Sequence, residues 1–166
     1  MTDGFPPIAD VDARVLILGT GPSLESLRRK EYYGNRMNGF WPIMASLWNE
    51  QPSTYADKQR LLLVHHIALW DVLSRFDRVG SLDSGYRKVE PNDLVPFISR
   101  HPLLKAVCFT GKTAEAFYHR LVGYYPEGIA FHALPSPSSA NTMPREEKRA
   151  IYADVLSRYL EGIRKG

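Results

Sequence analysis

Four short apolar runs, each leading into a loop-forming segment, constrain the fold of this chain most strongly. The runs occupy residues 14–18, 67–73, 106–109 and 129–134. Aliphatic and β-branched runs of this length predict strands that are buried on both faces. Helical patterns separate the runs, so the sequence predicts an α/β fold in which helices cover both faces of a mostly parallel sheet.

The segments between these runs predict helices. Residues 39–50 place apolar side chains on one helical face, and Pro42 requires that helix to begin close to Phe40. Residues 55–64 predict a second helix. Further helices are expected over residues 92–100, over residues 111–122 and after Pro144, the last packing through Ile151, Tyr152, Val155, Leu156, Tyr159 and Leu160.

The composition is that of a globular domain. The chain has 166 residues, of which 44% are hydrophobic and 23% are charged, so we expect one domain over residues 1–166. The apolar runs fall short of the about 20 residues that span a bilayer, and the N-terminus lacks the pattern of a signal peptide. We therefore expect a cytoplasmic protein that acts without a membrane.

The cysteine and histidine residues and the net charge limit which kinds of binding site the chain can form. Cys108 is the single cysteine, which excludes an internal disulfide, an iron–sulfur cluster and a zinc site built from several thiolates. The adjacent His65 and His66 have poor geometry for chelating one ion, so we expect neither a metal nor a cofactor. The net charge of +3 is compatible with a nucleic-acid partner but does not establish one.

Three loops follow predicted strands and define a candidate site. They are residues 19–23, continuing to Asn38, residues 110–112 and residues 135–141. In open α/β sheets, ligands bind beyond the carboxyl ends of the strands. The topology therefore predicts a site built from these three loops.

Neither glycine-containing loop has a complete nucleotide-binding motif. The segment from Gly19 through Thr20 to Gly21 lacks the Gly-Lys-Ser/Thr ending of a phosphate-binding loop. Gly111 and Lys112 match that ending, but the motif requires a further glycine five residues before Gly111, where this chain has alanine. Both loops are interpreted as turns that follow strands.

Two other segments carry side chains suited to nucleic acid. In residues 135–139, prolines stiffen the backbone and serine hydroxyls offer donors that suit phosphates, although an ordinary surface loop can have the same composition. Residues 32–41 are rich in aromatic side chains, which either stack on an unstacked base or pack in the core. For Trp41, packing in the core is the favoured interpretation.

Five segments in order resemble the uracil DNA glycosylase superfamily, most closely its hypoxanthine (deoxyinosine) branch, with the G/U-mismatch branch a near relative. They are residues 15–23, 32–41, 67–84, 109–114 and 134–141. The resemblance implies a three-layer α/β/α sandwich around a four-stranded parallel sheet. It also implies a monofunctional glycosylase of base excision repair that releases a flipped deaminated base, hypoxanthine and/or uracil, from double- or single-stranded DNA.

The resemblance assigns the catalytic residue. In the deoxyinosine branch the catalytic asparagine precedes a Phe-Trp pair, and Asn38 holds that position here. Other branches carry Asp or Asn where this chain has Gly21. Two departures stand out: residues 35–37 replace the usual His-Pro, which leaves base preference open, and Ser139 replaces the usual second proline of the last loop.

The sequence also suggests how such a site would work. Acidic residues are absent from residues 13–24 and 32–49, so these segments offer no obvious carboxylate. The uncharged amide of Asn38 is therefore expected to position a water molecule rather than to act as a strong base. Fixed hydrogen-bond donors would stabilise the charge that develops on the departing base.

The remaining contacts divide between the base and the DNA backbone. His65 immediately precedes the second predicted strand, where relatives carry a polar side chain that reads the base, and His66 is the alternative. The full expected set for the base is Gly19, Thr20, Gly21, Tyr33 as the stacking ring, Phe40 and His65. The expected DNA-binding residues are Lys112, Ser136, Pro137, Ser138 and Ser139.

Three alternatives stay open from the sequence. The first is a glycosylase specific for uracil opposite guanine. The second is a catalytically silent protein of the same fold that binds damaged DNA, and the third is an α/β enzyme that acts on free nucleotides. We expect a monomer in each case.

Overall fold

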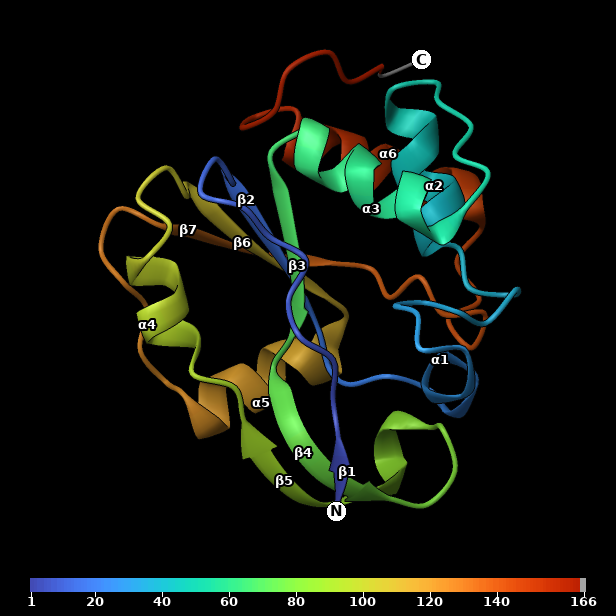
Figure 1. Cartoon of the computed structure of the whole chain (residues 1–166), viewed down its shortest axis with the longest axis vertical. Helices are drawn as coiled ribbons and strands as arrows, with labels where there is room; N and C mark the ends of the chain where they lie inside the picture. Colours follow the sequence, from blue (N-terminus) through green and yellow to red (C-terminus); the bar gives the residue numbers. More distant parts are fainter. Residues whose placement is uncertain (165–166) are drawn as a thin grey trace.

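The computed structural model describes residues 1–164 and is built around a parallel sheet of four strands (Figure 1). The strands are β2 (Val15–Gly19), β3 (Ile67–Asp71), β6 (Ala106–Thr110) and β7 (Ala130–Leu134), in the order β3-β2-β6-β7. All neighbouring pairs are parallel, with Val15 opposite both Ile67 and Ala106. The predicted α/β class and the four-stranded parallel sheet are confirmed.

Helices cover both faces of this sheet, as expected. Alternate residues of β2 point to opposite sides, so Ile17 joins one apolar cluster and Leu18 joins the other. The first cluster is completed by α2 (Phe40–Leu47), α3 (Tyr55–Val64) and α6 (Arg145–Leu156). The second is completed by α4 (Leu94–Ser99) and α5 (Lys112–Leu121), with α1 (Leu24–Arg29) lying outside both near the carboxyl edge (Figure 1).

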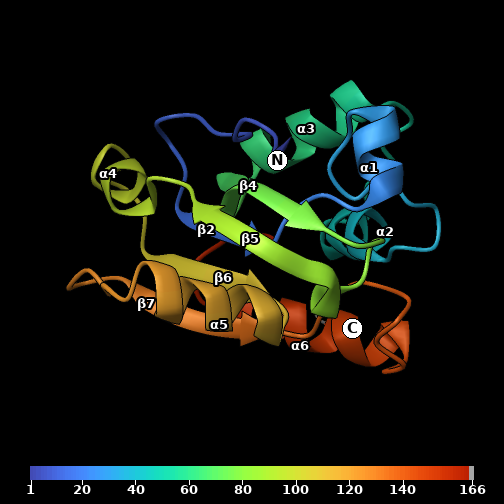
Figure 2. The ribbon, with the colours of Figure 1, turned by 90° about the horizontal axis from the view of Figure 1, so that it is seen from below.

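A second, antiparallel sheet was not predicted. It consists of β1 (Thr2–Asp3), β4 (Leu73–Arg78) and β5 (Tyr86–Pro91), with a short 3₁₀ helix, η1 (Asp83–Gly85), at the hairpin tip (Figure 2). The expected strand over residues 67–73 was wrong at its end, because the chain leaves the parallel sheet after Asp71. The N–H groups of Val72 and Leu73 donate to the carbonyls of Gly19 and Thr20, respectively. The chain turns away from the parallel sheet at this point, and β4 begins at Leu73.

The helix bounds otherwise follow the sequence patterns closely. The helix over residues 55–64 has the predicted ends, and Pro144 stands at the N-cap of α6. The expected packing side of α6 is corrected at one position: Ile151 is exposed, whereas Tyr152 and Leu156 are buried. Within residues 1–164, the helices are all too short or too polar to cross a membrane.

Cys108 lies at the centre of the parallel sheet. Its side chain is fully buried on β6, in the cluster beneath α2 and α6. Burial raises the pKa of its thiol to about 12, so the group stays protonated and unreactive at neutral pH.

Candidate active site

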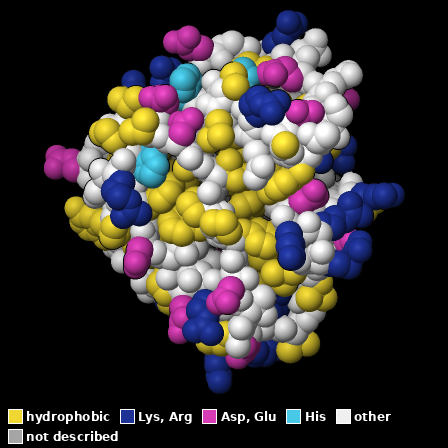
Figure 3. Space-filling view, viewed as in Figure 1, with side chains coloured by type: hydrophobic (Ala, Val, Ile, Leu, Met, Phe, Trp, Pro, Cys, Tyr) yellow, Lys and Arg dark blue, Asp and Glu magenta, His cyan; other side chains and the backbone are white. Residues whose placement is uncertain are grey.

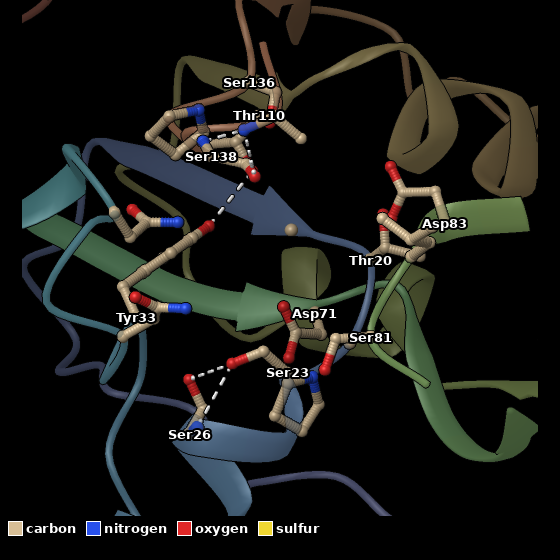
Figure 4. Close-up of a pocket in the computed structure, with 18 of the residues that line it drawn as sticks. Thr20, Ser23, Ser26, Tyr33, Asp71, Ser81, Asp83, Thr110, Ser136 and Ser138 are labelled. Carbon is tan, nitrogen blue, oxygen red and sulfur yellow. Dashed lines mark hydrogen bonds between the residues drawn. The ribbon is translucent and has the colours of Figure 1, made fainter. Parts of the chain in front are cut away.

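A cleft of about 490 Å³ lies beyond the carboxyl ends of the parallel strands, at the edge where the topology predicts a site (Figure 4). The predicted loops after β2, β6 and β7 all contribute to it, as does the segment that joins α1 to α2. The expected residues that line it are Gly19, Thr20, Gly21, Tyr33, Asn38, Ser136, Pro137, Ser138 and Ser139.

Gly19 lies where three polar side chains converge. A Cβ atom on Gly19 would stand 2.6 Å from Asp71 Oδ1, 2.9 Å from the Tyr33 hydroxyl and 3.5 Å from Thr110 Oγ1. The first two distances are shorter than real contacts allow, so a side chain here would displace the carboxyl group or the phenol. The glycine therefore allows β2 to end directly against these groups.

Asp71 places a carboxyl group in the cleft, although the sequence reasoning expected none. The side chain is 4% exposed, and its Oδ2 atom is buried without a hydrogen-bond partner among the described residues. Removal from water raises its pKa to about 7. An acidic residue at the carboxyl end of a buried strand was the signal that could have identified it.

Arg78 is the cation that acts on Asp71, and it opposes this shift only in part. Its guanidinium donates to the Pro22 carbonyl, the Gly80 carbonyl and the Tyr86 hydroxyl, so its N–H groups serve neutral acceptors. It also lies over the ring of Tyr86. The arginine thus fastens the β4–β5 hairpin to the loop after β2.

Tyr33 forms one wall of the cleft, with Phe40 packed behind it. The rings of Tyr33 and Phe40 stack with centroids 4.1 Å apart. Figure 4 shows the Tyr33 hydroxyl next to Thr110 Oγ1, at a distance of 3.0 Å. Tyr33 has a φ of 53°, a left-handed conformation that is unusual for a bulky residue. Phe40 is fully buried behind Tyr33, so the structure places it in the core and not in contact with a ligand.

Asn38 lies in the cleft with its side chain half-buried. Its Oδ1 atom accepts the N–H of Phe40 at 2.9 Å, which fixes the amide at the start of α2. The next residue, Gly39, donates its N–H to the Pro137 carbonyl at 2.8 Å. Asn38 is therefore held directly beside the Ser-Pro loop after β7.

The Ser-Pro loop is shaped by its own hydroxyls. Ser136 Oγ accepts the N–H of Ser138, and Ser138 Oγ accepts the N–H of Ala140. Both hydroxyl protons are left to be donated outward. Buried Lys148 donates to the carbonyls of Ser138 and Asn141, each at 3.0 Å, and holds the loop from behind.

Besides the buried Phe40, two further expected residues lie outside the cleft, His65 and Lys112. His65 caps the C-terminus of α3 before β3 begins, about 20 Å from the cleft by the rise of a strand, so the structure does not bring it to the place where it was expected to read the base. Its ring stacks on Trp48 at 3.8 Å and bonds to Glu50, and neighbouring His66 lies at the same end of β3. Lys112 is exposed at the first turn of α5, beside the rim.

The sequence reasoning missed the contribution of the β4–β5 hairpin. Arg78, Ser81, Asp83 and Tyr86 all line the cleft. The Ser81 hydroxyl accepts the N–H of Leu24 and so joins the hairpin to the start of α1. Ser81 and Asp83 belong to the segment 67–84 that resembles the family, but no site role was assigned to them because the hairpin itself was not predicted.

Comparison with known proteins identifies the family. The family model described as the uracil DNA glycosylase superfamily matches residues 6–158. The chain belongs to that superfamily. It is therefore a DNA glycosylase, a hydrolase, and the resemblance drawn from the five sequence segments is confirmed.

Its relatives include two curated proteins, each named hypoxanthine DNA glycosylase. The one from Methanosarcina acetivorans is 38% identical over 140 residues, covering 83% of this chain and 87% of the relative. The one from Methanosarcina barkeri is 31% identical over 159 residues, covering 93% and 98%.

A solved structure shares the fold of this superfamily member. It is the solution NMR structure of a Methanosarcina acetivorans protein assigned to uracil DNA glycosylase. The TM-score is 0.76 at 36% identity, and the match covers 90% of this chain and 95% of that one.

Proposed function

We propose that this glycosylase removes hypoxanthine from DNA by hydrolysing the N-glycosidic bond of a nucleotide rotated out of the helix. The observation that carries the proposal is the position of Asn38, which lines the same cleft as the Ser-Pro loop and is tied to it through Gly39. A group that positions water thus lies next to a loop suited to the DNA backbone. Both curated relatives carry hypoxanthine in their names.

The cleft residues take distinct roles in this proposal. The Asn38 amide orients the attacking water, since its Oδ1 has a second lone pair beyond the one used by Phe40. Tyr33 provides the ring against which the extruded base lies, because Phe40 holds that ring from behind. Backbone amides from Gly19 to Gly21 face the departing base.

The surface around the cleft suits a polyanion. The dark-blue cations at the right of Figure 3 gather over α1 and the segment that follows it. Exposed Lys30 and Arg36 belong to this stretch, and exposed Lys112 starts α5. Together with the hydroxyls of Ser136 and Ser138, they form the proposed contact to the phosphates on both sides of the lesion. We propose that the chain does this as a single domain and as a monomer.

An excision panel tests the function. Duplex and single-stranded oligonucleotides that carry one hypoxanthine, uracil or xanthine are incubated with the protein, treated with alkali and resolved by length. Hypoxanthine release is the expected result. Release of uracil alone, opposite guanine, would move the assignment to the mismatch-specific class. Binding without any release would make the protein a silent lesion binder.

The Ser136→Ala/Ser138→Ala double variant is expected to bind lesion DNA about 30-fold more weakly, with an unchanged order of preference among bases. Two hydroxyl donors to phosphate are lost, and each such bond contributes on the order of 1 kcal/mol. Fluorescence anisotropy at low salt measures the affinity. Ser157→Ala, which removes a hydroxyl at the C-cap of α6 that does not line the cleft, is the matched control. An affinity equal to that of the control would contradict the contact.

A further inference from the structure

Asp71 is a buried titratable group that lines the cleft and that the proposed roles do not use. Figure 4 shows its carboxyl group in the middle of the cleft, between Tyr33, Thr20 and Ser23. Asp71 ends β3, and its position is fixed because Asn92 donates its side-chain amide to the Asp71 carbonyl at 2.8 Å. Its buried Oδ2 atom lacks a partner within residues 1–164. A buried polar atom of this kind is costly unless a ligand completes it.

The groups that face Asp71 favour its neutral form. Tyr32 and Tyr33 from the segment after α1, and Tyr86 from β5, are phenols whose own pKa values are raised by burial, so they stay uncharged. Arg78 from β4 is the facing cation, and its N–H groups are already bonded to neutral acceptors. At neutral pH, a large share of the molecules therefore carries a proton on this carboxyl group.

We propose that Asp71 is the proton donor to the departing base, giving its carboxyl proton to N7 of the extruded purine. This inference rests on the proposed hypoxanthine excision and names a residue for its hardest step. A purine leaves poorly as an anion, and a neutral acid in a dry cleft removes that charge as it forms.

The O–H bond of Asp71 breaks and its proton bonds to N7, while the C1′–N9 bond breaks and its electron pair stays with the base, which leaves neutral. The water positioned by Asn38 bonds to C1′ and releases one proton to solvent. The Asp71 carboxylate then regains a proton from solvent, so the net reaction consumes one water.

The test compares wild type with Asp71→Asn in single-turnover excision from pH 5 to pH 9, on deoxyinosine and on 7-deaza-2′-deoxyinosine, which lacks N7. On deoxyinosine, the wild-type rate is expected to be flat below about pH 7 and to fall about tenfold per unit above it. Asp71→Asn is expected to be slower by about 100-fold at pH 6 and to lose this dependence. The 7-deaza substrate should slow wild type to the level of the variant and slow the variant little further.

Three controls make the outcome decisive. Circular dichroism confirms that Asp71→Asn is folded, and affinity for a duplex with a non-cleavable 2′-fluoro-deoxyinosine should stay within a few-fold of wild type. Asp93→Asn, an exposed acid beside α4, should match wild type. Identical pH profiles for wild type and Asp71→Asn, or equal slowing of both by the 7-deaza substrate, would overturn the inference. Failure of wild type to release hypoxanthine at any pH would instead refute the proposed function.

Discussion

Asn38→Ala is expected to lower single-turnover hypoxanthine excision by at least about 100-fold while DNA affinity changes only a few-fold. The variant removes the amide that orients the attacking water and leaves the Ser-Pro loop and the surface cations in place. The rate is measured with enzyme in excess over a duplex carrying one deoxyinosine, so that product release does not limit it. An unchanged rate would remove Asn38 from the mechanism.

A second variant separates chemistry from folding at this position. Alanine also deletes the acceptor for the Phe40 N–H, and loss of such a hydrogen bond costs about 1 kcal/mol of stability. Asn38→Asp keeps that acceptor and retains an oxygen that can hold water, so it should preserve stability and more activity than alanine. Gln51→Ala, which deletes an exposed amide before α3, is the control for loss of an amide as such.

Asp71→Asn is expected to stabilise the protein, and to do so more strongly as the pH rises. The pKa of Asp71 is about 7 in the folded protein and 3.8 in its ordinary state, so the folded protein holds the proton more tightly. Between these two values the folded state binds more protons than the unfolded state, so raising the pH lowers the stability of wild type. Above about pH 7, Asp71 is ionised in both the folded and the unfolded state, and the stability of wild type falls no further.

The size of this effect makes it measurable. The shift corresponds to a cost on the order of 4 kcal/mol at pH 8, which asparagine does not carry. Urea denaturation at pH 4.5, 6 and 8 gives the free energy of unfolding of each protein. The difference should be small at pH 4.5 and largest at pH 8, whereas Asp93→Asn should show no such trend. A difference independent of pH would contradict the buried acid.

This gain would come at the expense of function if Asp71 is the proton donor. Active-site groups are often held in states that destabilise the fold, and removing them stabilises the protein. Excision and unfolding measured on the same variant therefore report on one buried carboxyl group from two independent directions.

The parallel sheet could be predicted because its signal is local. Residues 15–18 and 106–109 are continuous apolar runs, which only a strand buried on both faces explains well at this length. The β4–β5 hairpin gave no comparable pattern. It buries Leu73 and Phe76 and packs Tyr86 and Val89 beside them, but charged and polar residues interrupt these positions, so its sequence lacks a continuous apolar run.

The site was predicted in part for a related reason. The glycine loop, Asn38 and the Ser-Pro loop lie at strand ends or in segments with unusual composition, which sequence alone can reveal. Asp71 lay inside what was read as an uninterrupted strand, so its place at the strand's end was hidden. His65 precedes β3 in the chain and so lies at the amino end of that strand, whereas the cleft lies at the carboxyl ends; chain direction alone could have shown this.

Because the thiol of Cys108 is buried, the protein is suited to site-specific fluorescent labelling. Cys108 is the single cysteine and its side chain on β6 is fully buried, so maleimide dyes should not react with it in the native protein. A cysteine introduced at an exposed surface position would then be labelled alone, without first deleting the native one. Fluorophores placed in this way on opposite sides of the cleft could report its engagement with a lesion in real time.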